Sequence, residues 1–165
     1  MTTHKPAGRI VTADEIATTT GLAKQHFLNS SAERINKSLG DLAGLTTLGF
    51  HLIEVAPGKM TTEHHVHHHE DECVFVLSGS GTAYLGDAAT QISAGDFVGY
   101  PAGGQAHHIE NTGTTPLQMI VTGARLPHDV VDYPRANRRL FRNDGMEWCT
   151  APLDQLEFPK AGAKS

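Results

Sequence analysis

The middle of the chain alternates short apolar runs with turn-forming residues. The first run, LTTLGFHLIEVA at residues 45–56, places Leu48, Phe50 and Leu52 at the two-residue spacing that is typical of a β-strand. A Pro-Gly pair follows this run directly, and such a pair is a strong turn signal. The pattern therefore predicts a strand that the chain leaves through a turn.

Further short apolar runs follow at intervals of roughly 8–12 residues, separated by Gly, Pro, Asp and Ser. No segment between residues 45 and 124 shows the helical period over roughly 10–12 residues that alternating strands and helices would need. This spacing predicts an all-β sandwich or barrel. The further predicted strands lie at residues 73–77, 82–85, 90–93, 97–100 and 117–122.

The two ends of the chain show weaker periodicity. Residues 1–44 predict an N-terminal extension that packs on the barrel, with a short helix near Ala13–Ala17 and Thr12 as its N-cap. Residues 125–165 are irregular and richer in arginine, and they end in a tail that we expect to be frayed. The sequence thus predicts one barrel at residues 45–124, with irregular extensions on both sides.

Composition limits the possible functions. The chain has 165 residues, of which 39% are hydrophobic, enough for one domain of about 100–150 residues with extensions. Its net charge is −5 and its longest basic run is Arg138–Arg139, which argues against a nucleic-acid partner. No stretch approaches about 18 apolar residues, and the first residues lack the apolar core of a signal peptide. We therefore predict no membrane partner and a cytoplasmic location.

The two cysteines do not form a metal-binding motif. Cys73 and Cys149 are far apart in the sequence, and a disulfide is not expected in a reducing compartment. Cys73 lies inside the apolar run CVFVL, which favours a buried small hydrophobic residue over a ligand or nucleophile. Cys149 lies beside Trp148, and the sequence leaves its role open.

The densest chemistry lies in the segment EHHVHHHEDE at residues 63–72, which contains five of the eleven histidines. Neutral imidazole binds Zn, Cu, Fe and Ni, whereas carboxylates favour harder divalent ions. A second histidine pair follows at His107 and His108. If the two clusters meet in the fold, they form a metal centre. A solvated loop that binds metal adventitiously is the competing interpretation of the run taken alone.

Strand geometry divides this histidine run into two sets. Alternate residues of a strand point to the same face, so His65 and His67 present two imidazoles side by side. His64 and His68 have the opposite parity, and we expect them to face solvent or to support the site. His69 shares the parity of the first pair, but a turn must intervene before the next strand. It is therefore an alternative ligand or a proton carrier.

The same parity argument applies to the strand after the histidine run. If it starts at Glu72, then Glu72, Val74 and Val76 share one face. Glu72 can then turn inward at the mouth of a barrel while the apolar residues below it form the core. Three imidazoles and this carboxylate would hold one divalent cation and leave one or two positions for water or substrate.

Two sequence motifs are similar to those of the cupin superfamily, in particular its small single-domain bacterial members. The first cupin motif runs Gly, a short spacer, His-x-His, a few residues, Glu, six residues and Gly. Here it corresponds to Gly58, His65-Val66-His67, Glu72 and Gly79, with one extra residue before the first histidine.

The second cupin motif runs Gly, five residues, Pro-x-Gly, a short spacer, His, three residues and Asn. Here it corresponds to Gly95, Pro101-Ala102-Gly103, His107 and Asn111, again with one extra residue before the histidine. The three-residue step to the asparagine favours His107 over its neighbour. Both motifs occur in the same order as in cupins, and the resemblance covers about half of the chain.

The resemblance implies a double-stranded β-helix, or jelly-roll barrel, with a metal ion inside one end. It assigns the ligands to His65, His67, Glu72 and His107, and the metal to one divalent ion (Fe, Mn, Zn or Ni). Cupins of this size are commonly homodimers, so the resemblance also implies a homodimer, to which the N-terminal extension and the region of Trp148 could contribute.

Fold does not determine function, and three classes of function remain open. The first is a metal-dependent enzyme on a small organic molecule, either a dioxygenase or a sugar-type isomerase or epimerase. The second is a non-catalytic module that binds a small ligand or a metal. The third is a storage-type jelly roll, which is disfavoured because all four ligand positions are filled. We favour the enzyme because the metal would keep an open position.

Strand parity suggests further candidates for the site. The candidate catalytic residues are His51, His69 and Tyr84, and the candidate substrate-pocket residues are Gln118, Met119 and Tyr84. Between residues 45 and 124 the only cationic side chain is Lys59. A phosphorylated substrate is therefore expected only if the arginines of the C-terminal tail fold back onto the barrel.

Overall fold

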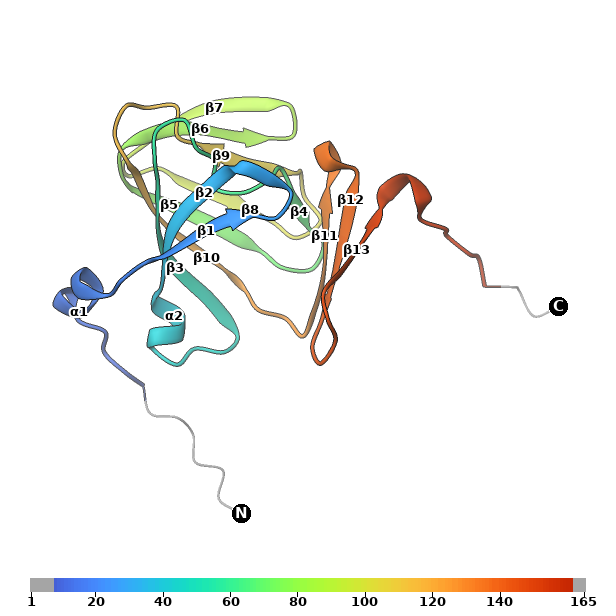
Figure 1. Cartoon of the computed structure of the whole chain (residues 1–165), viewed down its shortest axis with the longest axis horizontal. Helices are drawn as coiled ribbons and strands as arrows, with labels where there is room; N and C mark the ends of the chain where they lie inside the picture. The colour runs from blue at the N-terminus through green and yellow to red at the C-terminus, as the bar shows by residue number, and fades with distance from the viewer. Residues whose placement is uncertain (1–7, 162–165) are drawn as a thin grey trace, which may run out of the picture.

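The chain folds into three antiparallel sheets, which Figure 1 shows from one side. The structure is a computed structural model and describes residues 8–161. The largest sheet contains, in spatial order, β1 (Leu22–His26), β2 (Asn29–Ser38), β3 (Leu48–Val55), β10 (Leu117–Ala124), β5 (Glu72–Ser78) and β8 (Phe97–Tyr100).

Two smaller sheets complete the fold. The four-stranded sheet contains, in spatial order, β13 (Cys149–Pro152), β12 (Arg138–Asn143), β11 (His128–Tyr133) and β4 (Val66–His67). The three-stranded sheet contains β7 (Ala88–Ser93), β6 (Ser80–Leu85) and β9 (His107–Glu110). Strand thus dominates the described residues, and the predicted all-β class is confirmed.

The main hydrophobic core lies between the six-stranded and the three-stranded sheets. Ile53, Val76 and Met119 contribute from the larger sheet, and Ala83 and Ile109 from the smaller one, each at most 3% exposed. The predicted parity of the strand after the histidine run is confirmed, because its alternate residues 74 and 76 are buried. Burial of these apolar side chains is the main force that closes the two sheets on each other.

In β3 the tertiary structure selects the strand face that the sequence left undecided. The inward set is Gly49, His51, Ile53 and Val55, of which all but the histidine are buried. The alternating apolar residues 48, 50 and 52 lie on the other face, where they are exposed or half-buried. The strand is therefore apolar on both faces over much of its length.

Helices play a minor part in the described structure. The predicted N-terminal helix is confirmed as α1 (Ala13–Thr18), and the Thr12 side chain accepts a hydrogen bond from the Glu15 N–H at 3.2 Å. The other helical segments are α2 (Leu39–Leu42), η1 (Pro134–Ala136) and η2 (Leu153–Gln155). Within residues 8–161, no helix is long and apolar enough to cross a membrane.

The expected irregularity of the two extensions is wrong. Before residue 45, β1 and β2 form a hairpin that extends the six-stranded sheet. After residue 124, β11, β12 and β13 form most of the four-stranded sheet, and Val131, Tyr133 and Leu140 bury a second small core there. The pattern was hidden because the inward positions of these strands also carry polar side chains such as Asn36 and Asp129, which are buried.

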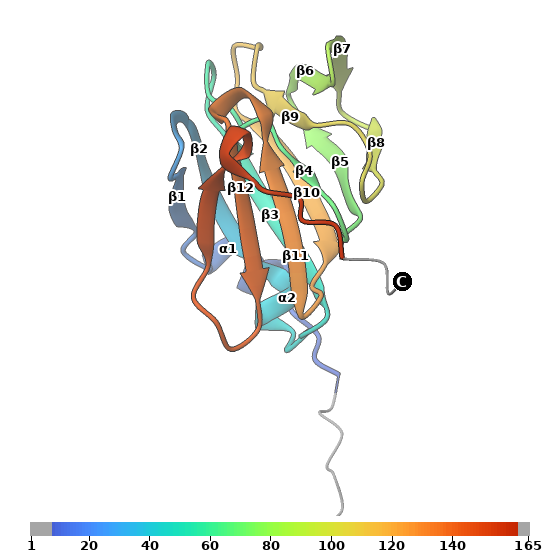
Figure 2. The same cartoon turned by 90° about the vertical axis from the view of Figure 1, so that its right-hand side faces the viewer.

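The histidine-rich segment joins two of the sheets. Its residue His65 forms an isolated bridge with His107 at the start of β9, and β4 pairs with β11 through Val66 and His67. Figure 2 views the molecule from the side of the C-terminal strands, which stand in front of the six-stranded sheet. The candidate site forms in a cavity between these two sheets.

Candidate metal centre

The fold brings the two histidine clusters together through backbone hydrogen bonds. The N–H of His65 donates to the carbonyl of His107 at 3.1 Å, and the N–H of His107 donates to the carbonyl of His65 at 2.7 Å. The two imidazole rings lie with their centroids 4.6 Å apart. Segments separated by about 40 residues in the sequence therefore present their side chains to one point.

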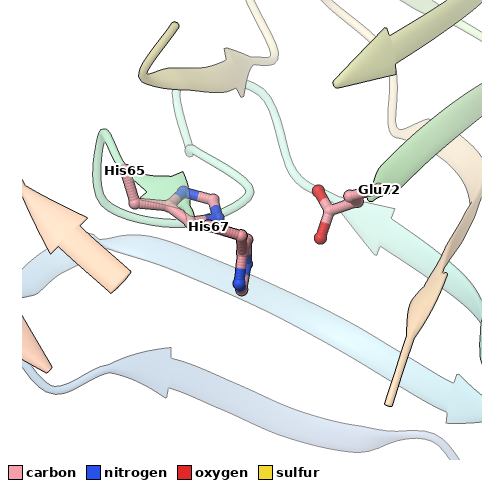
Figure 3. A group of neighbouring side chains, drawn as sticks. All are labelled: His65, His67 and Glu72. Carbon is pink, nitrogen blue, oxygen red and sulfur yellow. The ribbon is translucent and has the colours of Figure 1, made fainter. Parts of the chain in front are cut away.

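Three of the four residues that the sequence assigned as ligands lie within 4.8 Å of one another through their donor atoms: His65, His67 and Glu72. Figure 3 shows the Glu72 carboxylate at the start of β5 pointing toward the two histidines. His107 stands beside this group, with its Nε2 atom 3.7 Å from Glu72 Oε1. These four residues form a mixed nitrogen and oxygen donor set that fits a divalent transition metal.

In each of the three histidines, the Nδ1 atom forms a hydrogen bond with an oxygen acceptor. The distances from Nδ1 are 2.9 Å for His65, 2.6 Å for His67 and 3.2 Å for His107. The acceptors are the backbone carbonyls of Glu63 and Gln105 and the carboxylate of Asp129. Since these oxygens only accept, Nδ1 carries the proton and Nε2 keeps its lone pair free for a metal.

His107 gives the sharpest test of whether a metal fits. Its Nε2 atom is buried and has no hydrogen-bond partner among the described residues. A buried nitrogen without a partner is costly unless a ligand or ion satisfies it. Tyr100 stacks on the ring at a centroid distance of 3.6 Å with an interplanar angle of 4°, and thereby fixes its direction. The residues present thus fit a metal ion.

The charges at the cluster also favour a cation. Burial lowers the pKa of His65 to about 3, so this ring is neutral at pH 7 and able to bind a metal. Burial alone would raise the pKa of Glu72, but the nearby rings of His107, His65 and His67 outweigh it and lower that pKa to about 2. Glu72 is therefore an anion beside the neutral ring of His65.

His67 is held by a carboxylate from β11. Burial works against the charged ring, but the hydrogen bond to Asp129 and the charges of Glu72 and Asp129 outweigh it and raise the pKa of His67. Asp129 is 1% exposed and also accepts a hydrogen bond from the His69 N–H at 3.1 Å. A metal-bound histidine that donates to a carboxylate is fixed in ring orientation and tautomer.

A second carboxylate group beside His67 is already neutralised. Donor atoms of His67, Glu70 and Asp129 also lie within 4.8 Å of one another. However, the guanidinium of Arg142 forms an ion pair with Glu70 and lies 3.8 Å from Asp129 Oδ2. The arginine from β12 supplies the positive charge that a second metal would bring, so we assign this group to the support of His67.

The four candidate metal ligands line a cavity of about 290 Å³ between the six-stranded and four-stranded sheets. This volume is close to the lower end of the roughly 300–1,000 Å³ that small-molecule sites occupy. Three cationic residues line it: Lys24, Arg34 and Arg142. All three come from the extensions, and the aromatic side chains Tyr133 and Trp148 line it from the C-terminal extension.

Sequence reasoning missed most of these lining residues. For Arg142 a signal existed, because a phosphorylated substrate was expected only if tail arginines fold back, and this arginine does line the cavity. No sequence motif pointed to Tyr100, Lys24 or Arg34. Their role as lining residues depends on strand pairings that the sequence does not reveal.

The remaining catalytic candidates are not brought together. His51 lines the cavity, and its Nδ1 atom lies 3.4 Å from Asn36 Nδ2. Burial and the charges of Arg125 and Lys24 lower the pKa of His51. His69 is exposed and packs near His128, with ring centroids 5.6 Å apart.

The three candidate pocket residues are not among those that line this cavity. Met119 is fully buried in the main core. Gln118 donates a hydrogen bond to Glu54 at 2.9 Å. Tyr84 stacks on the ring of His108 at a centroid distance of 4.4 Å.

The histidines of opposite parity are not simple solvent-facing residues. His64 is 4% exposed, and its Nδ1 atom lies 2.9 Å from Nδ1 of His108, which is 3% exposed. His68 contacts Asp132 through Nε2 at 2.9 Å. Of the two alternatives for His64, facing solvent or supporting the site, the first is wrong, because the backbone bridge between residues 65 and 107 places His64 against a second buried imidazole. The second alternative stays a prediction.

Both cysteines are free thiols. Cys73 is half-buried on the outer face of β5, and there burial and the charge of Glu72 raise its pKa. Cys149 is exposed at the start of β13.

Comparisons with known proteins address the family and the fold. Residues 51–123 match the family model of the Cupin domain. A comparison with curated proteins finds no match. A proposed sugar phosphate isomerase from Acidithiobacillus ferrooxidans is 47% identical, with a TM-score of 0.89 over 92% of this chain and 97% of that chain.

Two further solved structures are similar over shorter parts of the chain. A sugar phosphate isomerase of the cupin superfamily from Silicibacter pomeroyi is 25% identical over 85% of this chain and 90% of that chain, with a TM-score of 0.74. A predicted oxalate decarboxylase from Thermotoga maritima shares the fold at 24% identity, covering 67% of this chain and 96% of that chain, with a TM-score of 0.57. With both motifs in place and a relative that matches nearly its whole length, the chain belongs to the cupin superfamily.

Proposed function

We propose that this protein is a metal-dependent isomerase that acts on a small sugar-type molecule. The observation that carries the proposal is the convergence of three free histidine nitrogens and one carboxylate beside a cavity of ligand size. The two relatives named for sugar phosphate isomerisation match 92% and 85% of the chain, which supports an isomerase over a dioxygenase.

Four residues would hold the metal: His65, His67, Glu72 and His107. One divalent ion, with Fe, Mn, Zn and Ni as candidates, would act there as a Lewis acid that polarises an oxygen of the substrate. The protein fixes the ligands before the ion arrives, since each histidine Nδ1 is held by an oxygen acceptor. Such fixed ligands reduce the cost of binding the ion.

Isomerisation moves a proton between neighbouring carbons and therefore needs a group that accepts and returns it. We assign this role to His51, which lines the cavity and is neutral at pH 7 because its pKa is lowered. Tyr100 also lines the cavity, and its hydroxyl is buried without a hydrogen-bond partner among the described residues. Burial raises the pKa of Tyr100, so its hydroxyl stays protonated and can donate a hydrogen bond to a substrate oxygen.

Metal content and turnover test the proposal. Protein purified without a metal-affinity tag should bind one divalent ion per chain. After reconstitution, it should interconvert aldoses or aldose phosphates and the matching ketoses without consuming oxygen. Oxygen uptake with a substrate would instead indicate a dioxygenase. Stoichiometric metal and sugar binding without turnover across the panel would indicate the non-catalytic module.

A matched variant pair separates chemistry from metal binding. His51→Gln should reduce turnover by about 100-fold or more while metal content is unchanged, because it removes the proton acceptor and leaves the ligands. His69→Gln makes the same substitution at an exposed histidine between β4 and β5 and should leave turnover unchanged. Equal effects of the two substitutions would contradict the assignment of His51.

The homodimer and the cytoplasmic location that the sequence suggested are kept as proposals. Support for the dimer comes from exposed apolar side chains on the outer face of the six-stranded sheet. There Phe75 in β5 and Phe97 in β8 occupy paired positions on adjacent strands. Phe75 is 44% exposed and Phe97 is 65% exposed. Light scattering should give twice the mass of the chain, and a monomer at micromolar concentration would contradict the dimer.

A further inference from the structure

Two like charges face each other across the N-terminal hairpin. Lys24 in β1 is paired directly with Arg34 in β2, and both residues line the same cavity as the candidate metal ligands. Like charges in directly opposed positions of neighbouring strands are destabilising. The arrangement therefore favours an anion bound near these two side chains.

No carboxylate among residues 8–161 forms an ion pair with either side chain. The acidic groups nearby have other partners: Glu33 pairs with Lys59 at 2.8 Å, and Asp41 pairs with Arg125. Glu72 acts on Arg34 electrostatically but lies beyond ion-pair distance. Once Glu72 is committed to a metal ion, the two cations have no counter-ion among the residues that the structure describes.

We propose that Lys24 and Arg34 bind the phosphate group of a phosphorylated sugar substrate. A phosphate monoester carries a charge of about −1.5 to −2 at neutral pH, which matches the two adjacent positive charges better than a single carboxylate does. A guanidinium presents a planar set of N–H donors that fits phosphate oxygens, and an ammonium adds a compact point charge. This inference deepens the proposed function, on which it rests for the substrate's sugar part.

The guanidinium is positioned before any ligand arrives. Arg34 Nη1 donates to the backbone carbonyl of Thr61, and that contact leaves its other donors free. Thr61 itself lines the cavity and hydrogen-bonds the Ile109 N–H through its hydroxyl at 3.1 Å, which ties the contact to β9. A preorganised donor loses less conformational entropy when it binds an anion.

The position of the hairpin suits a substrate that spans the cavity. In Figure 3 the two blue strands of the N-terminal region run below the histidine side chains. Residues of β1 and β2 line the same cavity as the ligand histidines, so a sugar can reach the metal while its phosphate lies at the hairpin. Burial and the neighbouring Arg34 lower the pKa of Lys24, and a bound anion would relieve this repulsion.

Arg142 is not part of the proposed phosphate site. It lines the same cavity, but Glu70 and Asp129 already neutralise its charge. The two cations of the hairpin remain as the pair that lacks an ion-pair partner within residues 8–161.

The test measures binding to the metal-reconstituted full chain by calorimetry. The probes are inorganic phosphate, an aldose phosphate, the same aldose without phosphate, and the matching sugar acid. Arg34→Gln and Lys24→Gln should each weaken phosphate and aldose phosphate binding by about tenfold. Binding of the unphosphorylated aldose and the metal content should not change. Lys160→Gln removes one positive charge from an exposed residue that does not line the cavity, and as the matched control it should have no effect.

The possible outcomes separate this inference from the proposed function. Unchanged phosphate binding in both variants would show that phosphate lies elsewhere, for example on the metal, and would overturn the inference even if isomerase activity is found. Phosphate binding that depends on both residues, without isomerase turnover, would uphold the anion site and overturn the proposed function. Tighter binding of the sugar acid than of the aldose phosphate would overturn the choice of phosphate.

A loss caused by misfolding is separable from a loss of phosphate recognition. Lys24 is exposed at the cavity rim, so Lys24→Gln should keep the melting temperature of the wild type. Arg34→Lys keeps the charge but loses the planar set of donors, and should weaken phosphate binding less than Arg34→Gln does. If Arg34→Lys and Arg34→Gln lower binding and melting temperature in parallel while Lys24→Gln has no effect, the role of Arg34 is structural and the inference is wrong.

Discussion

The segment that matches the cupin family and the two extensions contribute different chemistry to one cavity. Residues 51–123 contain all four predicted metal ligands and, within this range, a single lysine as the only cationic side chain. The N-terminal hairpin and the C-terminal strands contribute the cavity's cations, Lys24, Arg34 and Arg142, and the carboxylate of Asp129. A barrel that carries the candidate metal ligands is thus combined with cavity walls that carry the cationic side chains.

The difference explains why the family alone says little about the reaction. The candidate metal donors lie on strands that many jelly-roll proteins could place in the same way, whereas all the arginine and lysine side chains that line the cavity lie outside the matched segment. The relatives named for sugar phosphate isomerisation match 92% and 85% of this chain, so their similarity reaches beyond the 51–123 segment. The extensions are therefore the region in which to look for substrate selection.

The largest expected effect comes from removing a ligand of the matched segment. His107→Ala should lower metal affinity by more than about 100-fold, since it deletes one of four donors. Elemental analysis and metal titration measure the loss, and circular dichroism should show an unchanged fold. His128→Ala, an exposed histidine in β11, is the control and should keep the metal. Full metal content in the His107→Ala protein would remove this residue from the metal centre.

The second prediction asks whether an extension also shapes the metal centre. Asp129→Asn should weaken metal binding by about 10–100-fold, because His67 loses the carboxylate that fixes its tautomer. Asp132→Asn in the same strand alters a carboxylate bound to Arg139 and should have little effect on the metal. If the two variants bind metal equally well, the C-terminal extension does not support the metal centre through Asp129.

The third prediction concerns how the free energy of unfolding depends on pH, to which a histidine of the matched segment should contribute. Burial and the charge of His64 lower the pKa of His108 to about 4, below the ordinary value of about 6.5. Between these values the unfolded chain binds more protons than the folded chain, so stability falls as the pH falls. Metal-free protein should lose about 2 kcal/mol between pH 7 and pH 5 through this residue.

A variant isolates the contribution of that residue. His108→Asn removes the titrating ring, so the dependence of unfolding free energy on pH should become flatter, whatever the variant's overall stability. Urea denaturation at several pH values measures both slopes. Equal slopes in the two proteins would show that the pair His64 and His108 accepts protons freely, contrary to its burial.

The smallest expected effect lies at the rim formed by the C-terminal extension. Trp148 lies at the cavity and is 64% exposed, and the guanidinium of Arg142 lies 5.7 Å from its ring centre. Trp148→Ala should raise KM about twofold to fivefold, because an exposed cation–π contact is worth about 0.5–1 kcal/mol. Metal content should not change. A loss of metal would mean that the rim also supports His67 through Arg142.

Much of the barrel was predictable because its apolar and turn-forming residues recur at regular spacings. Alternating apolar residues and Gly/Pro turns predicted the strands, and the parity of residues 65, 67 and 72 placed three candidate ligands on one side. The extensions were not predictable in this way, because their inward faces carry Lys24, Arg34, Asn36 and Asp129 in place of apolar residues. The division of the chain at residues 44 and 124 and the identity of the ligands stay predictions.

By itself, the sequence determined the all-β class, the family motifs and the two histidine clusters, because local periodicity and residue spacing carry this information. Only the tertiary structure decided which residues meet around the cavity, because that depends on pairings between distant strands. The bridge from His65 to His107 joins the clusters, and the pairing of β1 with β2 sets Lys24 against Arg34. Long-range register is therefore what converts a histidine-rich segment into a site with a charged wall.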